Sequence, residues 1–479
     1  MKINDIKSVY GALPQCGAVL QALSGDSVRT LFLQGLSASA APVLFSAIAE
    51  KLRKTVVFIL QDADEAGYFY HDLTQIMGQD DVLFFPSSYR RAVKYGQRDA
   101  ANEILRTEVL SRLSRRKEGK RTSLYIVSCP EAVSELVVSK TRLDERTLTL
   151  TAGQTVDLVE IQRMLREFGF SEVDYVYEPG QFAVRGSIMD VYSFSSEWPF
   201  RIDFFGNEIE TIRTFEVQDQ LSRDRRDTVE IVPELTRTAD EKMPFTSFLP
   251  SDTLLVVKDM LYLRETVGRI YQEGFSSQAM TERLEGATEA EQAEIMRDMR
   301  RDNQLVSGTR FSEEASSFRR IEIGHNATGT PDATISFNIT PQPLFHKNFD
   351  LLTRSLEDYR LMGYKLYILA DSEKQTKRLR DIFDSDEIKA RDYDIKFEPV
   401  DRTLHEGFAD NDLRACFFTD HQIFDRFHKY SLRSDTARSG KMALTMKELQ
   451  EMEPGDFIVH VDFGIGKFGG LVRVPAGDT

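Results

Sequence analysis

The chain has 479 residues, a formal net charge of −15, and 41% hydrophobic and 29% charged residues. This length predicts about three domains, and the composition is ordinary for a globular protein. The negative charge argues against a free-standing, high-affinity DNA-binding protein, because neutralised phosphates supply most non-specific affinity for DNA. No run of 18 apolar residues occurs, so we expect no membrane-spanning helix.

The cysteines and histidines predict neither disulfides nor a metal site. Cys16, Cys129 and Cys416 lie too far apart for a metal-binding knuckle or a disulfide framework. The seven histidines show no ligand spacing. Residues 1–7 lack the apolar core of a signal peptide, and we therefore expect a cytoplasmic protein.

The first third alternates short apolar runs with helical stretches. Strands are expected at 31–33, 56–60, 82–85 and 124–127, with helices near 42–54 and 101–113. This order is typical of a parallel sheet that helices cover on both faces. The densest basic run, 112–121, follows a helical stretch, and we interpret it as a solvated loop.

A nucleotide-binding loop would be expected after the first strand, but its key residues are missing. A phosphate-binding loop needs a glycine-rich turn, a lysine and a hydroxyl residue. Gly35 is in register, whereas Ala41 replaces the lysine and Pro42 the hydroxyl residue. We therefore expect no ATP or other cofactor site and no catalytic residues in this chain.

Three other short patterns imitate cofactor motifs. Asp64-Glu65-Ala66-Gly67 is better explained as acids at a helix start. Asp462-Phe463-Gly464 has no accompanying kinase loop. The glycines at 464, 466 and 469 precede an expected strand at 471–474, whereas a dinucleotide site needs a helix there.

From about residue 143 the pattern changes to a helix followed by hairpins. A helix is predicted from Asp157 to Phe168, ended by Gly169, and alternating strands follow from 178 to 205. Alternation places Arg201, Asp203 and Phe205 on one face, which suits partner recognition. The same pattern also allows Phe205 to be a core ring and Arg201–Asp203 a solvated ion pair.

The remaining chain contains further α/β elements. A strand is expected at 253–257, surface helices at 281–304, and a strand at 366–369 followed by a helix capped by Asp371 or Ser372. The strand-then-cap pattern recurs at 416–420. A helical linker leads to a block that begins at Pro454 and ends before a barrel closes, so we expect a piece of a longer protein.

Two blocks carry a family resemblance. The string Gly-x-Phe-Ala-x-Arg-Gly-x-x-x-Asp at 180–190, with Pro-Phe-Arg-Ile-Asp-Phe-Phe at 199–205, resembles the UvrA-binding module of UvrB and of the transcription-repair coupling factors (Mfd). Residues 454–468 resemble the start of the RNA-polymerase-interaction domain of that second family. UvrB has no such block, so the pair favours the coupling factors.

The resemblance implies a multidomain α/β fold with six segments. These are a UvrB-like degenerate NTPase domain (1–146), an inserted α+β UvrA-binding module (147–233), the rest of the first domain (234–345), a small α/β domain (346–445), a linker (446–453) and the start of a small β-rich, Tudor-like domain (454–479). The DNA clamp of UvrB corresponds to 84–89 here and is expected to be shortened.

The resemblance also implies a function. Arg185, Arg201 and Phe205 match the family's UvrA contacts, and the domain that begins at Pro454 would bind RNA polymerase. The expected role is an adaptor that recruits UvrA to stalled polymerase for nucleotide excision repair. The family's ATP- and Mg-dependent DNA translocase, which makes most of its DNA contacts, would lie beyond this chain. The alternative is UvrB itself or another superfamily 2 helicase with a working ATP site.

Overall fold

The computed structural model describes most of the chain. The described residues are 1–88, 100–115, 123–217, 219–235, 242–274, 292, 296, 304–385, 393, 395–426, 430, 455–460 and 464–470. The chain separates into two compact units: residues 1–149, 194–196 and 230–433 form the first, and residues 150–193, 197–229 and 434–479 the second. Each unit is considered by itself.

A seven-stranded sheet forms the centre of the first unit. In spatial order its strands are β17 (Ala333–Ser336), β1 (Thr30–Gln34), β16 (Arg319–Gly324), β15 (Leu254–Val257), β2 (Thr55–Ile59), β4 (Leu124–Ser128) and β3 (Val82–Phe85). Every neighbouring pair is parallel. The expected parallel sheet is therefore confirmed, and strands from before and after the inserted module complete it together.

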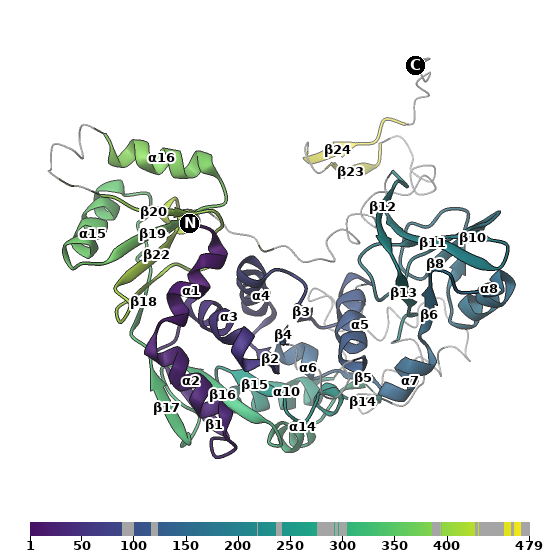
Figure 1. Ribbon diagram of the computed structural model, residues 1–479, viewed down its shortest axis with the longest axis horizontal. Helices are drawn as coiled ribbons and strands as arrows, with labels where there is room; N and C mark the ends of the chain where they lie inside the picture. The colour runs from purple at the N-terminus through teal and green to yellow at the C-terminus, as the bar shows by residue number, and fades with distance from the viewer. Residues whose placement is uncertain are drawn as a thin grey trace. The chain divides into compact units, whose positions relative to one another are not determined.

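Two groups of helices cover this sheet (Figure 1). One contains η1 (Ile3–Asp5), α1 (Ile6–Gly11), α2 (Pro14–Ser24), α3 (Ala40–Leu52) and α4 (Ala63–Met77). The other contains α6 (Pro130–Val133), α9 (Phe245–Phe248), α10 (Met260–Glu273) and α14 (Gly308–Ala315). Helix α5 (Ala100–Ser114) packs near β3, and α7 (Lys140–Glu145) follows the short strand β5 (Leu136–Val138), which pairs with β14 (Lys242–Pro244).

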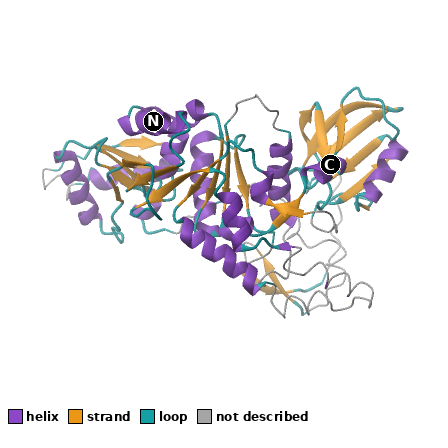
Figure 2. Ribbon diagram, turned by 90° about the horizontal axis from the view of Figure 1, so that it is seen from below, coloured by secondary structure: helices purple, strands orange, loops and turns teal. Residues whose placement is uncertain are grey.

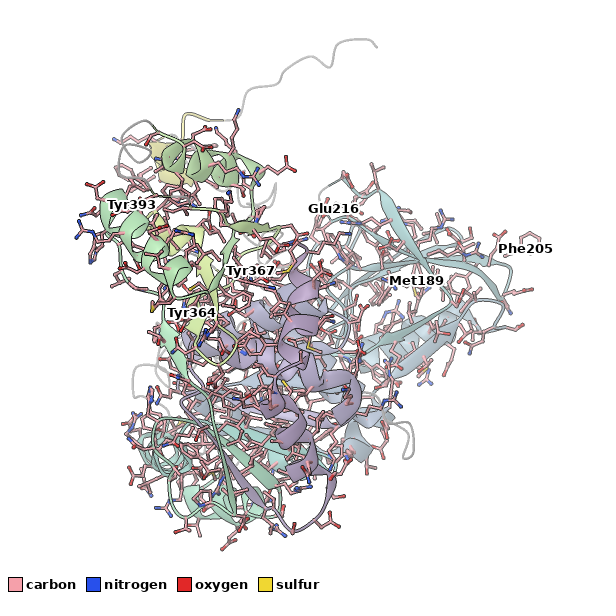
Figure 3. All side chains as sticks on the ribbon, turned by 60° about the vertical axis from the view of Figure 1, so that its left-hand side comes forward. Met189, Phe205, Glu216, Tyr364, Tyr367 and Tyr393 are labelled. Carbon is pink, nitrogen blue, oxygen red and sulfur yellow. The ribbon has the colours of Figure 1, made fainter. Side chains whose placement is uncertain are left out.

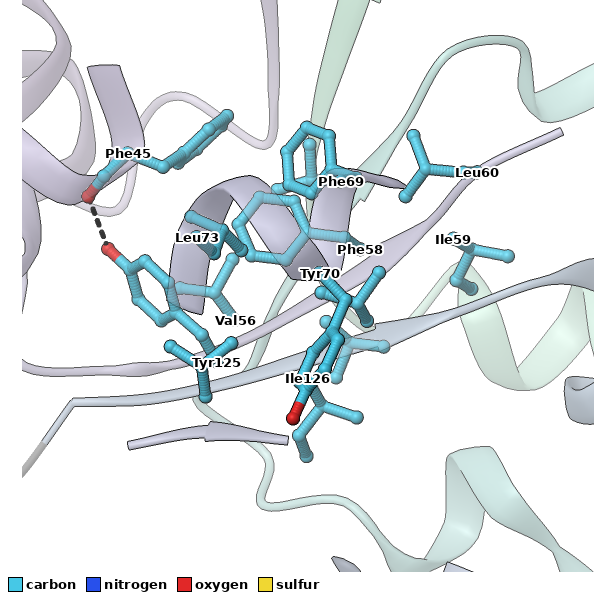
Figure 4. Packing of buried hydrophobic residues seen from close by; sticks show 14 of the residues in the cluster. Phe45, Val56, Phe58, Ile59, Leu60, Phe69, Tyr70, Leu73, Tyr125 and Ile126 are labelled. Atoms are coloured by element: carbon cyan, nitrogen blue, oxygen red, sulfur yellow. Dashed lines mark hydrogen bonds between the residues drawn. The ribbon is translucent and has the colours of Figure 1, made fainter. Parts of the chain in front are cut away.

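Aromatic side chains fill the space between the sheet and the first helix group (Figure 4). The Phe58 ring of β2 lies 4.9 Å from the ring of Phe45 and 4.8 Å from that of Phe69. The buried Tyr125 hydroxyl donates to the carbonyl of Phe45 at 2.8 Å, which satisfies its one polar atom. This packing fixes α3 and α4 on the sheet.

In the described residues of the second unit, a six-stranded sheet is accompanied by the helix α8 (Leu158–Glu167); Figure 2 shows strands in orange and helices in purple. Its strands are, in spatial order, β12 (Ser222–Arg226), β11 (Glu208–Phe215), β10 (Phe200–Phe205), β9 (Ile188–Val191), β8 (Gln181–Arg185) and β7 (Ser171–Glu172). All pairs are antiparallel except β7–β8. The short strands β6 (Leu148–Thr151) and β13 (Thr228–Ile231) form a separate pair where the chain enters and leaves this module.

A five-stranded mixed sheet completes the first unit. Its strands are β18 (Ile339–Pro341), β21 (Phe408–Asp410), β22 (Ala415–Thr419), β19 (Lys365–Leu369) and β20 (Glu398–Val400), accompanied by α15 (Phe349–Leu361), α16 (Glu373–Phe383) and α18 (Asp420–Ile423). Because β17 belongs to the seven-stranded sheet and β18 to this one, the change of sheet falls between Ser336 and Ile339. The predicted boundary at 345 lies after it.

The N-terminal segment is hydrogen-bonded to the five-stranded sheet and its loops. The amino group of Met1 donates to the Pro399 carbonyl at 2.8 Å, and the Ile3 N–H donates to Asp401 at 2.8 Å. The buried Tyr10 hydroxyl donates to Asp410 at 2.8 Å. The first ten residues therefore connect the two sheets of the first unit.

The block after Pro454 is described as one antiparallel hairpin, β23 (Phe457–His460) and β24 (Gly464–Lys467). Most of the predicted helices at 281–304, the linker 446–453, the strand at 471–474 and Tyr89 lie outside the described residues. None of the helices within the described ranges combines the length and apolar composition that crossing a bilayer requires.

Candidate docking site and the degenerate nucleotide site

The two predicted arginines of the β-sheet module share one buried carboxylate. Asp190 on β9 lies directly opposite Arg201 on β10, and its side chain is 0% exposed. Arg201 Nε donates to Asp190 Oδ1 at 2.8 Å and Nη2 donates to Oδ2 at 2.9 Å. Arg185, at the end of β8, also donates to Asp190 Oδ2. A single anion therefore positions both guanidinium groups.

Aromatic rings and carbonyls hold the same arginines from other sides. The guanidinium carbon of Arg201 lies 4.6 Å from the centre of the Phe215 ring, and its Nη1 donates to the Gln220 carbonyl at 3.0 Å. The guanidinium carbon of Arg185 lies 4.8 Å from the centre of the Tyr175 ring. The hydrogen bond with Asp190 is the main cause that raises the pKa of Arg201, so this group stays charged.

The exposure of the two arginines differs. The side chain of Arg201 is only 17% exposed, whereas that of Arg185 is 36% exposed. The described hydrogen bonds of both arginines are internal to the module, and Arg201 is the less accessible of the two. Arg185 donates from Nη1 to the Asp174 carbonyl at 2.7 Å and presents the more accessible guanidinium edge.

Phe205 lies at the end of β10 and is 79% exposed. Figure 3 shows its ring pointing away from the module. Its neighbours Ile202 and Phe204 are buried, as the alternating pattern predicts, even though the β10–β11 pairing shifts register between Asp203 and Phe204. The alternative that Phe205 is a core ring is therefore wrong.

Asp203 does not form the alternative ion pair with Arg201. Its carboxylate accepts from Arg213 Nη2 at 2.9 Å and from the Thr211 hydroxyl at 2.6 Å, both on β11. Arg213 lies opposite Arg201 in the sheet, and Arg225 on β12 lies opposite Arg213. One face of the module therefore carries a row of arginines across three strands.

Sequence reasoning did not find the roles of Asp190 and Tyr175. Asp190 is the last residue of the string that carries the family resemblance. The signal available in the sequence was a carboxylate between two apolar strand residues, Met189 and Val191, which places it on the opposite face of the strand from them. Tyr175 is 52% exposed in a segment without regular strand pattern. Its contact with Arg185 depends on tertiary structure and leaves no periodic signal.

The degenerate nucleotide site lies at the carboxyl end of β1. Gly35 has φ of 77°, and an added Cβ would approach the carbonyl oxygen of Phe337 to 2.3 Å, so only glycine fits. At the start of α3 the Ala41 N–H donates to Ala38 O at 3.4 Å, and Pro42 has no N–H. The helix start has therefore lost donors that a phosphate would need.

A cavity of about 650 Å3 adjoins this loop. Six of its lining residues are acidic, namely Asp62, Asp64, Glu65, Asp72, Asp259 and Glu406. Among the described residues of the lining, Lys258 is the one lysine or arginine, and it is paired with Glu65. This excess of negative charge opposes the binding of a polyphosphate.

Asp64 and Glu65 are helix-entry acids, as expected. They lie in the first turn of α4, whose N-cap Asp62 accepts from both of their N–H groups at 2.9 Å. Among the described residues no group of three or more His, Cys, Asp or Glu side chains could hold a metal ion. His421 packs with Nε2 2.8 Å from the His405 carbonyl, and burial lowers its pKa.

The basic run at 112–121 is partly described. Arg112 donates to the Asp80 carbonyl at 2.5 Å, and Arg115, which follows α5, pairs with Glu230. The side chains of Arg112 and Arg115 are 39% and 51% exposed, so the described part of this run is partly accessible to solvent while it pairs with neighbouring groups. Residues 116–122 lie outside the described ranges.

Comparison with known proteins identifies a relative for the inserted module and for the chain as a whole. Residues 148–236 match the family model described as the UvrB interaction domain, in agreement with the segment that interrupts the first unit. The chain is 21% identical to a transcription-repair-coupling factor of Bacillus subtilis, over 98% of this chain and 43% of that protein.

Two further relatives have the same name. They come from Staphylococcus aureus (22% identity, 93% of this chain, 42% of the relative) and Staphylococcus haemolyticus (22% identity, 94% and 43%). This chain is homologous to the transcription-repair coupling factors. The resemblance stated from the two sequence blocks is thereby confirmed. The chain spans less than half the length of these coupling factors.

Proposed function

We propose that this chain is the adaptor region of a transcription-repair coupling factor and recruits UvrA to stalled RNA polymerase for nucleotide excision repair. The observation that carries the proposal is the exposed Phe205 at the end of β10, the strand that also carries Arg201, together with the two arginines that Asp190 holds in place, within a matched UvrB interaction domain. Ordered arginines and exposed aromatic rings are the side chains that most often anchor protein interfaces.

The electrostatics of this surface favour an acidic partner. Arg185, Arg201, Arg213 and Arg225 lie on the same side of the sheet as three carboxylates, Asp190, Asp203 and Glu208. The excess positive charge suits carboxylates on UvrA, and the ring of Phe205 suits an apolar pocket beside them.

A competition experiment tests the proposal. Labelled chain is titrated with purified UvrA, and unlabelled UvrB is then added. Because UvrB would use the corresponding module, we expect saturable binding of UvrA that UvrB displaces. Absence of binding at micromolar UvrA, with a folded chain, would contradict the proposal.

RNA polymerase is the second proposed partner, through the domain that begins at Pro454. In the described hairpin, Phe457 and Ile465 are 73% and 76% exposed and lie on the same face, since Phe457 pairs with Lys467 and Val459 with Ile465. An apolar face on two strands needs further structure or a partner to cover it. Two strands are too few to bury an independent core, so we expect this chain alone to capture polymerase poorly. Robust capture of polymerase by the chain would show that the polymerase site lies elsewhere.

We infer that the chain itself does not hydrolyse ATP and that the family's translocase activity, with its ATP and Mg requirement and most of its DNA contacts, belongs to segments outside this chain. The acidic cavity and the loss of donors at Ala41 and Pro42 support this inference over the alternative of a helicase with a working ATP site.

A further inference from the structure

The degenerate nucleotide site contacts a loop from the five-stranded sheet. This loop, residues 403–406, connects β20 with β21. The His405 N–H donates to Asp72 Oδ1 at 2.7 Å, and the Glu406 N–H donates to Ser39 Oγ at 2.9 Å. Ser39 lies at the start of α3, where a phosphate-binding loop would be, and Asp72 lies on the neighbouring helix α4.

Ser39 and Asp72 form one connected hydrogen-bond chain. Ser39 Oγ donates to Asp72 Oδ2 at 2.5 Å and accepts from Glu406, while the other oxygen of Asp72 accepts from His405. Both side chains are 2% exposed. Buried polar groups that are fully hydrogen-bonded specify one arrangement of their neighbours, because each broken bond leaves an uncompensated polar group.

Apolar and aromatic contacts support the same loop. The rings of His405 and Tyr68 are stacked, with centres 3.5 Å apart and planes at 11°. Leu404 is 1% exposed and belongs to the same hydrophobic cluster as Leu36 and Phe69 of the first domain. The loop is therefore held by side chains of α4 and by the segment that follows β1.

The polarity of this site is the reverse of that of a nucleotide site. A phosphate-binding loop presents N–H donors to phosphate oxygens. Here Pro42 lacks a donor, while Asp72 and Ser39 present acceptors. An occupant of such a site must bring donors, and two successive backbone N–H groups of the 403–406 loop do so.

We propose that the degenerate nucleotide site is a docking socket in which Ser39 and Asp72 bind the 403–406 loop in cis and hold the two α/β domains as one unit. The socket lies at the carboxyl edge of the parallel sheet, which is where open α/β folds bind their ligands. Here a segment of the same chain binds at that edge, and its His405 and Glu406 line the cavity together with Ser39 and Asp72. The proposal is independent of UvrA binding.

Hydrogen exchange of the complete chain tests the socket. Exchange is followed by mass spectrometry in a peptide that covers 403–407, for the wild type, Ser39→Ala and Asp72→Ala. We expect the amides of His405 and Glu406 to exchange at least about tenfold faster in both variants. The Gly407 N–H, which donates to Gln422 within the five-stranded-sheet domain, serves as an internal reference and should keep its rate.

Two matched controls lie on the same helices. Ser46 on α3 donates to the Pro42 carbonyl and Thr74 on α4 donates to the His71 carbonyl, so both bond within their own helix. Ser46→Ala and Thr74→Ala should leave exchange of the 403–407 peptide unchanged. Equal acceleration by these controls would overturn the proposal, because the effect would then be general destabilisation.

The milder variant decides the case if Asp72→Ala fails to fold. Ser39→Ala removes one hydroxyl from the chain and leaves Asp72 in place. Unchanged protection of His405 and Glu406 in folded Ser39→Ala would overturn the socket. Protection that millimolar ATP abolishes in the wild type would overturn it as well, because the site would then still prefer a nucleotide to the loop.

Discussion

Asp190 and Arg201 face each other across the antiparallel strands β9 and β10 and form a two-point ion pair at 2.8 and 2.9 Å. The same buried carboxylate also accepts a hydrogen bond from Arg185. Asp190 therefore contributes to the stability of the module and also fixes the positions of both arginines. The two arginines are therefore expected to differ in what their removal does. Arg201 is mainly a positioning residue, whereas Arg185 and Phe205 are available to a partner.

Arg201→Ala should lower the free energy of unfolding by about 2–4 kcal/mol, because it leaves the buried Asp190 with only one cationic partner. Urea denaturation of the complete chain measures this. Arg225→Ala, an exposed arginine in the same row, should change stability by no more than about 0.5 kcal/mol. Equal free energies of unfolding for the two variants would show that the ion pair between Arg201 and Asp190 makes no net contribution to stability.

Arg185→Ala should weaken binding of UvrA about tenfold, which corresponds to about 1.4 kcal/mol, and should reduce the dependence of the affinity on salt. Arg163, an exposed arginine on α8 paired with Glu160 and Glu167, provides the control. Its alanine variant should bind as the wild type does. Isothermal titration at two salt concentrations distinguishes these outcomes, and equal losses for both variants would argue for a nonspecific charge effect.

Millimolar ATP with magnesium should leave the melting temperature unchanged, since the cavity beside Ala41 and Pro42 is acidic. Differential scanning fluorimetry of the wild type checks this. A rise of several degrees that depends on ATP dose and magnesium would show that the chain binds nucleotide in spite of the missing lysine and hydroxyl.

Asp72 should make stability depend on pH. Burial raises the pKa of Asp72 from its ordinary value of 3.8 to about 7, although the hydrogen bonds from Ser39 and His405 act in the opposite direction. The folded protein then binds more protons than the unfolded chain between these values. This contribution to stability is present at low pH and is lost as pH rises toward 7.

The Asp72→Asn variant isolates this effect. Its stability relative to the wild type should increase with pH by up to about 1.4 kcal/mol per unit between pH 4 and 7. Burial also raises the pKa of Glu406 and lowers that of His421, but both groups are present in both proteins. Parallel stability curves from urea titrations at several pH values would contradict the raised pKa.

The elements that sequence predicted well are those with a local signal. Apolar runs located β1, β2, β3 and β4, and the stripe ending at Gly169 located α8, because periodicity and helix stops depend on neighbouring residues. The alternative caps Asp371 and Ser372 could not be separated. In the structure Ser372 caps α16, whereas Asp371 accepts from the Thr403 N–H.

What sequence could not predict depends on contacts between distant segments. The bond between Tyr10 and Asp410 and the docking of His405 on Asp72 join residues that are hundreds of positions apart. For the proposed UvrA-docking residues, the sequence predicted the shared strand face but not the burial of Arg201. Alternation placed Arg201 and Phe205 on one face, but the burial of Arg201 depends on Asp190 and Phe215, which approach only when the sheet forms.

Phe205→Ala gives the most direct measurement of UvrA docking. The Phe205 ring is 79% exposed, so its removal should change stability by no more than about 0.5 kcal/mol. The same change should weaken UvrA binding at least about tenfold, whereas Val159→Ala, an exposed apolar residue on α8, should bind as the wild type does. A folded Phe205→Ala variant that binds UvrA with wild-type affinity would contradict the proposed docking surface.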